Sequence, residues 1–210
     1  MPVNNYISSS CVIRQNRVWK TGVEIFKNVD TGLHAFFSSL YLHLLSPYPK
    51  FYKMDNLSKL GWLASEILLK DGHLTEKYSP EQIGIVISNA DSSLDTDRKY
   101  FETMNDMPSP ALFVYTLPNI MLGEISIRNN FKGENAFFIA DQFDAYFTEK
   151  YVSFLLDNKS MKACICGWVN VLDEEYQAAL FLVEKGEVGE HPMFTKETMD
   201  DIFNERIISA

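Results

Sequence analysis

The sequence of 210 residues predicts an α/β protein in which helices pack on a mostly parallel five-stranded sheet. Short apolar runs rich in β-branched residues alternate with segments whose apolar residues recur at helical spacing. Hydrophobic residues make up 46% and charged residues 22% of the chain, which excludes a disordered or fibrous protein. The length suits one domain over residues 1–210.

The first third of the chain predicts strands followed by a helix. The runs NNYISSSCVIRQ and RVWKTGVEIF mix β-branched and polar residues, with a Gly turn, and both are typical of strands. Apolar residues at helical spacing predict a helix over 32–45, which the proline-rich SPYPKFY then ends. Residues 18–54 could be an insertion or part of an interface.

The middle of the chain predicts a helix and a buried strand. Five apolar residues of DNLSKLGWLASEILLK share one helical face, and Asp55 or Asn56 is placed to cap its N-terminus. The run IGIVISNA, at 83–90, is typical of a strand buried on both faces of a parallel sheet. The polar loop 91–97 follows it directly.

The second half continues the alternation of helices and strands. The predicted elements are a helix over 97–104, a helix with Pro118 early in it that runs to Phe131, a buried strand over 136–140, a helix over 144–156, antiparallel strands over 161–172 and 176–186, and a C-terminal helix over 195–206 capped by Thr195.

Charge and hydropathy exclude several kinds of partner. The formal charge is −9 and no basic patch is visible, so we expect no nucleic acid and no anionic lipid among the partners. An acidic acyl carrier protein would be repelled by this surface. No apolar run approaches the ~20 residues of a membrane span, and the N-terminus lacks the pattern of a signal peptide. We therefore expect a cytoplasmic protein.

The sequence predicts no metal or other cofactor. Cys11, Cys164 and Cys166 are an odd number of cysteines, which favours reduced thiols, and the C-x-C pair is better explained by core packing than by zinc. The four histidines share no ligand spacing with a carboxylate or cysteine. The acidic loop 91–97 could hold a hard cation, but a solvated helix-capping loop is favoured.

A block from Pro110 to Gly133 has a recognisable pattern, P-x-x-F-x-Y-T-L-P-N-x-x-x-G-E-I-x-I-R with a later Gly. Its members are Pro110, Phe113, Tyr115, Thr116, Leu117, Pro118, Asn119, Gly123, Glu124, Ile125, Ile127, Arg128 and Gly133. The block resembles one found in β-ketoacyl-ACP synthases, and the helix and first strand upstream are similar to the family too. The resemblance implies the N-terminal half of the thiolase fold. The spacing of Glu124 and Arg128 is also consistent with a structural ion pair.

Glutamine occupies the position where the resemblance implies a catalytic cysteine. In the family, a nucleophilic cysteine follows the last Gly of the block and begins a helix, whose N-terminus favours a thiolate. Nine positions after Gly133 lies Gln142, and a slip of one residue would place Asp141 there. Neither side chain can form a thioester. Alternatively, Gln142 only caps the following helix.

The resemblance implies an acyltransferase family and suggests a non-catalytic member of it. Gln at this position resembles the chain-length factors that pair with a ketosynthase, and the family's histidine-bearing second half has no counterpart here. We therefore expect a partner of a complete β-ketoacyl-ACP synthase in fatty acid, polyketide or polyene biosynthesis, as a heterodimer or homodimer that meets acyl carrier protein indirectly. Phe137, Phe138 and Ile139 are the expected dimer contacts.

Two other functions remain open. Gln142 resembles the glutamine of decarboxylating loading domains, so its amide could stabilise an enolate during decarboxylation of malonyl-ACP. A homodimeric module could instead bind an acyl chain or small molecule, with Phe113, Tyr115 and Phe143 lining a pocket. These aromatic residues are more simply explained as core.

Overall fold

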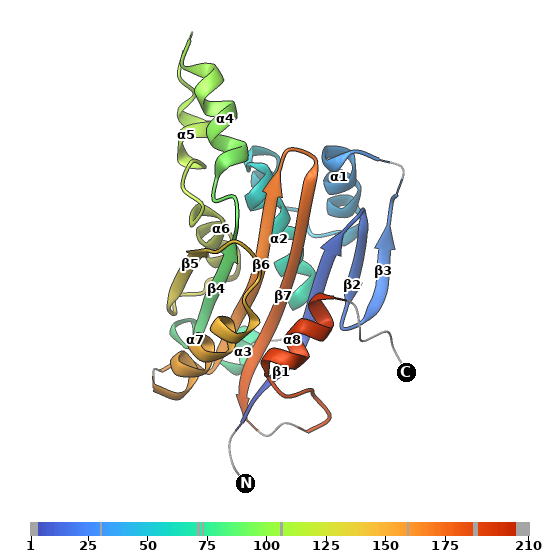
Figure 1. Ribbon diagram of the computed structural model, residues 1–210, viewed down its shortest axis with the longest axis vertical. Helices are drawn as coiled ribbons and strands as arrows, with labels where there is room; N and C mark the ends of the chain where they lie inside the picture. Colours follow the sequence, from blue (N-terminus) through green and yellow to red (C-terminus); the bar gives the residue numbers. More distant parts are fainter. Residues whose placement is uncertain are drawn as a thin grey trace.

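The computed structural model describes residues 4–29, 31–70, 72, 74–105, 107–158, 160–186 and 189–204. A seven-stranded sheet with the order β3-β2-β1-β7-β6-β4-β5 runs through this part of the chain (Figure 1). The strands are β1 (Asn4–Arg14), β2 (Arg17–Lys20), β3 (Val23–Lys27), β4 (Ile83–Asn89), β5 (Asn135–Ile139), β6 (Ala163–Leu172) and β7 (Glu175–Gly186).

Helices connect the strands and cover the sheet. They are α1 (Leu33–Leu44), α2 (Asn56–Leu69), α3 (Leu74–Lys77), α4 (Leu94–Thr103), α5 (Pro110–Val114), α6 (Ile120–Asn129), α7 (Ala145–Asn158) and α8 (Lys196–Phe203), with short 3₁₀ turns η1 (Pro49–Lys53) and η2 (Pro80–Gln82).

Strand directions confirm the predicted class. β4 pairs in parallel with β5 and β6, and β7 lies antiparallel between β6 and β1. Four of the five core strands therefore run in one direction, with β7 reversed. The sheet has seven strands instead of the predicted five. The run RVWKTGVEIF, predicted as one strand, forms both β2 and β3, which extend the sheet beyond β1 as antiparallel strands. Their turn, Thr21-Gly22, has positive φ at both residues.

Two hydrophobic clusters lie on opposite faces of the sheet. Alternation along β4 and β6 sends Ile85 and Ile165 to the cluster beneath α1, α2 and α6, and sends Val86 and Cys166 to the cluster beneath α7 and α8. Figure 1 shows these helices in front of and behind the strands. This is the layered arrangement that an α/β sequence pattern predicts.

Several predicted boundaries are confirmed and two are wrong. Asp55 caps α2 by accepting a hydrogen bond from Ser58 N at 2.9 Å. The helix expected around Pro118 begins only after its cap, Asn119, because residues 115–118 form a tight turn between α5 and α6. The helix expected from 97 begins earlier, at Leu94.

Helices α4 and α5 project beyond the sheet. They extend past the carboxyl end of β4 as an arm, drawn at the top of Figure 1. Seven apolar side chains of the arm and its adjoining turns are exposed: Leu94, Phe101, Met104, Met107, Phe113, Val114 and Leu117. Exposed apolar surface gathered in this way is typical of a surface that contacts a partner.

The cysteines pack in the core as predicted. Cys164 and Cys166 point into the cluster beneath α7, and Cys11 points into the opposite cluster. Burial raises the pKa of all three thiols, to about 12 for Cys164, so they stay protonated at neutral pH. In the described part of the chain, no helix is long and apolar enough to cross a membrane.

Candidate functional site

The turn between β5 and α7 holds the position predicted to replace the nucleophile. Ala140 N still donates to Asn89 O at 2.9 Å, so the chain leaves the sheet directly after this residue. Gln142 follows as an exposed residue, and α7 begins at Ala145. The topology therefore places Gln142 between a strand and the N-terminus of the helix that follows.

Asp144 caps α7. Its Oδ1 accepts a hydrogen bond from Phe147 N at 2.8 Å, and its carbonyl oxygen accepts one from Thr148 Oγ1. This geometry is that of an N-cap, so the alternative in which Gln142 caps the helix is wrong. The amide of Gln142 is therefore not needed to cap the N-terminus of α7.

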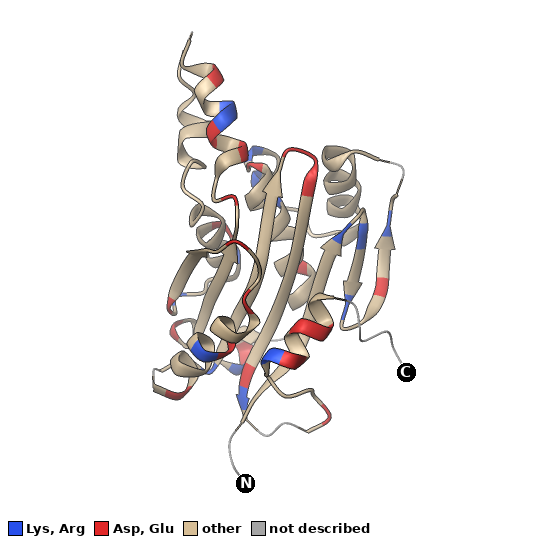
Figure 2. Ribbon diagram, viewed as in Figure 1, with Lys and Arg blue, Asp and Glu red and all other residues tan. Residues whose placement is uncertain are grey.

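The surroundings of Gln142 are open and acidic. The hollow around it is also lined by Asp141, Asp144 and Asp200, with Lys196 as a cation. Figure 2 shows red segments in this turn and on the nearby helix α8. The Gln142 side chain has no thiol for acyl transfer. The hollow around it is not the dry, positively charged site that would stabilise a developing anion.

Strand β5 lies at an edge of the sheet and is only partly buried, whereas the sequence predicted a buried strand over 136–140. It pairs with β4 alone among the described strands. Phe138 packs edge-on against Phe147 and Tyr151 of α7, at centroid distances of 4.8 and 5.1 Å. Phe137 packs on the opposite cluster, and Ile139 is 56% exposed. No strand in the described part of the chain pairs with the second side of β5.

The two edges of the sheet differ in charge. β3 carries Glu24 and Lys27, and Glu24 also pairs with Arg17 of β2 at 2.6 Å. β5 has the sequence NAFFI, without a charged residue, and is entirely tan in Figure 2. Charged residues on an edge strand prevent pairing with another chain. The β5 edge lacks that protection.

The family-block residues form the connection from the arm to β5. Pro110 begins α5, Asn119 precedes α6, and Phe113 is exposed on the arm. Tyr115 is buried and donates from its hydroxyl to Glu124 Oε1 at 3.0 Å. Burial, together with Glu124, raises the pKa of Tyr115. The block thus ties α5 to α6.

The expected ion pair between Glu124 and Arg128 is wrong. Glu124 is buried and pairs with Lys50 of η1 at 2.8 Å. Arg128 donates to both carboxylate oxygens of Glu66 on α2, at 3.2 and 3.3 Å, and stacks over the Tyr48 ring. Partners from other elements compete with a neighbour four residues away on the same helix.

Gly133 lies where two backbone segments approach closely. Its amide donates to Ile83 O at 3.1 Å, and a Cβ at this position would lie 2.3 Å from the same oxygen. Only glycine fits without displacing the segment that leads into β5.

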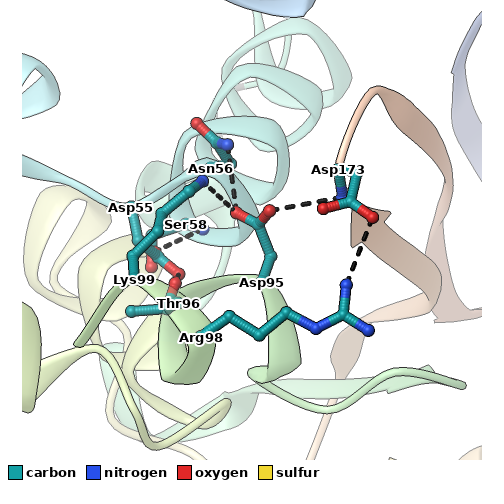
Figure 3. A network of polar contacts seen from close by, with 8 residues as sticks. All are labelled: Asp55, Asn56, Ser58, Asp95, Thr96, Arg98, Lys99 and Asp173. Carbon is teal, nitrogen blue, oxygen red and sulfur yellow. Dashed lines mark hydrogen bonds and ion pairs between the residues drawn. The ribbon is translucent and has the colours of Figure 1, made fainter. Parts of the chain in front are cut away.

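The acidic loop after β4 forms a buried network instead of the solvated cap that was predicted (Figure 3). Asp95 is buried, and its carboxylate accepts hydrogen bonds from Asn56, Lys99 and the backbone N of Asp173, at 3.1, 2.6 and 3.2 Å. The neighbouring Thr96 hydroxyl donates to Asp55 Oδ2 at 2.7 Å. The network joins the base of the arm to α2 and to the β6–β7 turn.

No cation is needed to explain this loop. Lys99 supplies the positive charge on Asp95, and Arg98 pairs with the Asp173 carboxylate at 3.2 Å. Among the described residues, no cluster of three or more His, Cys, Asp or Glu side chains is placed to hold a metal ion. Apart from the Lys99–Asp95 pair, which spans one helical turn, these contacts join positions 39 to 78 apart, and the sequence did not predict them.

Asp55→Asn is expected to keep the unfolding free energy at pH 7 within about 1 kcal/mol of the wild-type value, because Asn caps helices as well as Asp. Burial raises the pKa of Asp55 above its ordinary 3.8, so its contribution to stability falls as pH rises through the folded-state pKa. Asp55→Asn should remove this fall in urea titrations at a series of pH values, and an unchanged pH profile would contradict the prediction. Asp55→Ala should lack the same fall, and should be about 1 kcal/mol less stable than Asp55→Asn at every pH because it has no cap.

The aromatic residues expected around one pocket lie apart. Tyr115 belongs to the cluster under α2, whereas Phe143 stacks on Phe203 of α8 at 4.8 Å on the opposite face. Phe113 is on the arm. The pocket built on these three residues is therefore wrong.

The three histidines in the described part of the chain lie away from the β5–α7 turn. His34 and His43 are exposed on α1, on the other face of the sheet, and His43 contacts Phe26. His191 stacks on Tyr6, near the amino end of β1 and thus at the opposite end of the strands. His73 lies outside the described residues.

Comparison with solved structures identifies the fold. No protein-family model matches the chain, and no curated protein does. A type II polyketide synthase complex, the acyl-carrier protein with its ketosynthase AntDE:AntF, matches 88% of this chain at 16% identity with a TM-score of 0.61. The ishigamide ketosynthase/chain length factor matches 90% of this chain at 16% identity with a TM-score of 0.62. The chain spans 63% and 64% of these two structures' matched chains.

A third match has a similar length. In the complex of the ketosynthase ApeO with its chain length factor ApeC, from Xenorhabdus doucetiae, the alignment covers 97% of this chain and 92% of the matched chain. The identity is 11% and the TM-score 0.57. The fold is therefore that of the thiolase-like ketosynthases and chain length factors. The resemblance seen in the sequence extends to the tertiary structure.

Proposed function

We propose that this chain is a non-catalytic ketosynthase-like subunit, similar to a chain-length factor. It would act with a complete β-ketoacyl-ACP synthase in fatty acid, polyketide or polyene biosynthesis, in the cytoplasm. Residues 1–210 would form a single domain like the N-terminal half of a ketosynthase. The observation that carries the proposal is that an unprotected edge strand leads directly into a turn that has Gln142 where a nucleophile would stand.

The β5 edge supports a protein partner. In a parallel pair of strands, every second residue of a strand directs its backbone N–H and C=O to the same neighbour. Ala140 donates from its N to Asn89 O, so it belongs to the set that faces β4. Phe137 and Ile139 belong to the other set, and their backbone groups are directed away from β4. A strand of the partner's sheet would satisfy these groups. The exposed side chain of Ile139 would become buried in the same contact.

The arm of α4 and α5 supports a second area of contact. Its base is held by the Asp95 and Asp55 network, so the arm is positioned before any partner binds (Figure 3). Met107 is 80% and Phe101 69% exposed, and such side chains gain most from burial in an interface. The partner would bring the catalytic residues, and this chain would help shape the acyl pocket.

The comparisons agree with this proposal at the level of fold. One matched chain has nearly the same length and comes from a complex of a ketosynthase with its chain length factor. An acyl carrier protein would bind chiefly through the ketosynthase, because the charge of −9 on this chain repels an acidic carrier.

Decarboxylation of malonyl-ACP is the less favoured function. Three carboxylates surround Gln142 against one lysine, so an anionic malonyl group would be repelled from this hollow. The chain incubated with malonyl-ACP should therefore release no acetyl-ACP. Turnover that disappears in Gln142→Ala would instead establish the decarboxylase.

Co-expression tests the proposed partnership. The chain should co-purify with a complete ketosynthase encoded beside it, and light scattering should give the mass of one copy of each. Condensation of malonyl-ACP by the complex should exceed that of the ketosynthase alone. A monodisperse chain with no affinity for that ketosynthase would overturn the proposal, and a stable dimer of this chain alone would favour the homodimeric module.

Gln142→Cys is expected to give no β-ketoacyl synthesis by this chain alone. The described histidines lie on the other face or at the other end of the strands, so a thiol at the turn lacks the groups that activate the malonyl substrate. A thiol reagent should label this exposed cysteine in the folded variant but none of the three buried native ones. Condensation by the folded, unlabelled Gln142→Cys chain would contradict the non-catalytic assignment.

A further inference from the structure

An apolar pocket lies at the opposite edge of the sheet from β5. It is partly open to solvent and is lined by residues of β1, β2, β3, the β2–β3 turn and α8 together with Pro192, and its volume is about 440 Å³. Pockets that bind small molecules have volumes of ~300–1,000 Å³ and mostly apolar walls. The size of this pocket is therefore in the range of a ligand site.

The walls of the pocket are apolar. Ile7 and Val12 of β1 are buried in the cluster beneath α7, and Trp19 and Ile202 are partly buried against the same cluster. Helix α8 packs on α7 and β1 and supplies Ile202 as the wall facing the strands. A chain of methylene groups in this space would be removed from water, which favours its binding.

One end of the pocket is polar. Arg17 Nη1 pairs with Glu24 Oε2 at 2.6 Å, and both side chains are partly exposed. Thr21, in the exposed β2–β3 turn, also lines the pocket. A guanidinium has five N–H donors. The oxygen of a ligand's carbonyl or carboxylate could therefore accept a hydrogen bond from Arg17 while Arg17 keeps its ion pair with Glu24.

We propose that this pocket binds a single unbranched acyl chain whose carboxyl group, free or esterified, lies at Arg17. The apolar walls fit the hydrocarbon, and the polar group at one end fits an amphipathic molecule better than a wholly apolar one. The site lies at the other end of the strand order from β5. The proposal therefore does not depend on the ketosynthase partnership, and either can fail alone.

Contact quenching of tryptophan tests the proposal directly. Dodecanoic acid brominated at carbon 6, in the half of the chain next to the carboxyl group, should quench the fluorescence of Trp19, which lines the pocket two residues from Arg17 on β2, and leave that of the buried Trp62 and Trp168. Trp19→Phe should lose the quenched fraction. Absence of saturable quenching in the wild-type chain, or its persistence in Trp19→Phe, would overturn the site.

Three variants separate the wall from the polar end. Ile202→Ala should weaken binding of the brominated acid about tenfold, as the loss of several wall carbons predicts. Ile127→Ala, on α6 and 68% exposed, is the matched control and should bind as wild type. Arg17→Gln should weaken the free acid about tenfold and its methyl ester less. Equal binding of the acid by wild type, Ile202→Ala and Arg17→Gln would overturn the assignment.

Discussion

Gly133→Ala is expected to lower the free energy of unfolding by about 2–3 kcal/mol, the upper part of the range for overpacked positions. The new Cβ would lie 2.3 Å from Ile83 O and 2.7 Å from Ile83 C, which are backbone atoms at the start of β4 and cannot rotate away. The two segments must separate, which weakens the neighbouring bond from Ile85 N to Glu134 O. For a chain of this length the melting temperature should fall by about 5–10 °C.

Gly123→Ala is the matched control, in the same sequence block. It lies inside α6, and no atom lies within 4 Å of its added Cβ. Alanine there should raise stability by about 0.5–1 kcal/mol, because glycine is the poorer helix former. Urea unfolding of both variants measures the difference. Equal stability of Gly133→Ala and the wild type would contradict the close approach.

Ile139→Lys is expected to weaken binding to the partner ketosynthase at least about 30-fold, the loss typical of an important interface residue. Ile139 is exposed in the free chain, so the substitution should leave the fold intact. In the complex the ammonium group would be buried without a partner at the open edge of β5. Calorimetric titration of the ketosynthase with the variant measures the loss.

Val23→Lys controls for the added charge. Val23 is 58% exposed and lies on β3, the edge strand at the other side of the sheet, so the two variants differ chiefly in which edge they alter. Its affinity for the ketosynthase should stay within about twofold of wild type. Equal losses in both variants would show that charge, and not the β5 edge, governs binding.

These two results would link stability and assembly through one segment. Gly133 sets how closely the chain leading into β5 approaches β4, and β5 then presents Ile139 at the open edge and Gln142 at its end. A Gly133→Ala chain that still folds should therefore also bind the ketosynthase less well. The same titration measures this without a new assay.

Patterns confined to neighbouring residues predicted a large part of the fold. The apolar run of β4 is buried throughout, Asp55 caps α2, and β6 and β7 pair as an antiparallel hairpin. Each of these depends on periodicity or on a bond across a few residues, which the sequence contains in full. The block from Pro110 to Gly133 likewise pointed to the thiolase-like fold.

Tertiary structure alone decided which residues meet. An apolar run such as β5 has the same pattern at an edge as in the middle of a sheet, because the number of neighbouring strands depends on distant segments. Asp95 became buried because Asn56 and the Asp173 amide satisfy its carboxylate, and Glu124 found Lys50 instead of Arg128. Hydrogen bonds and ion pairs of this kind join positions far apart in the sequence, so only the folded chain determines them.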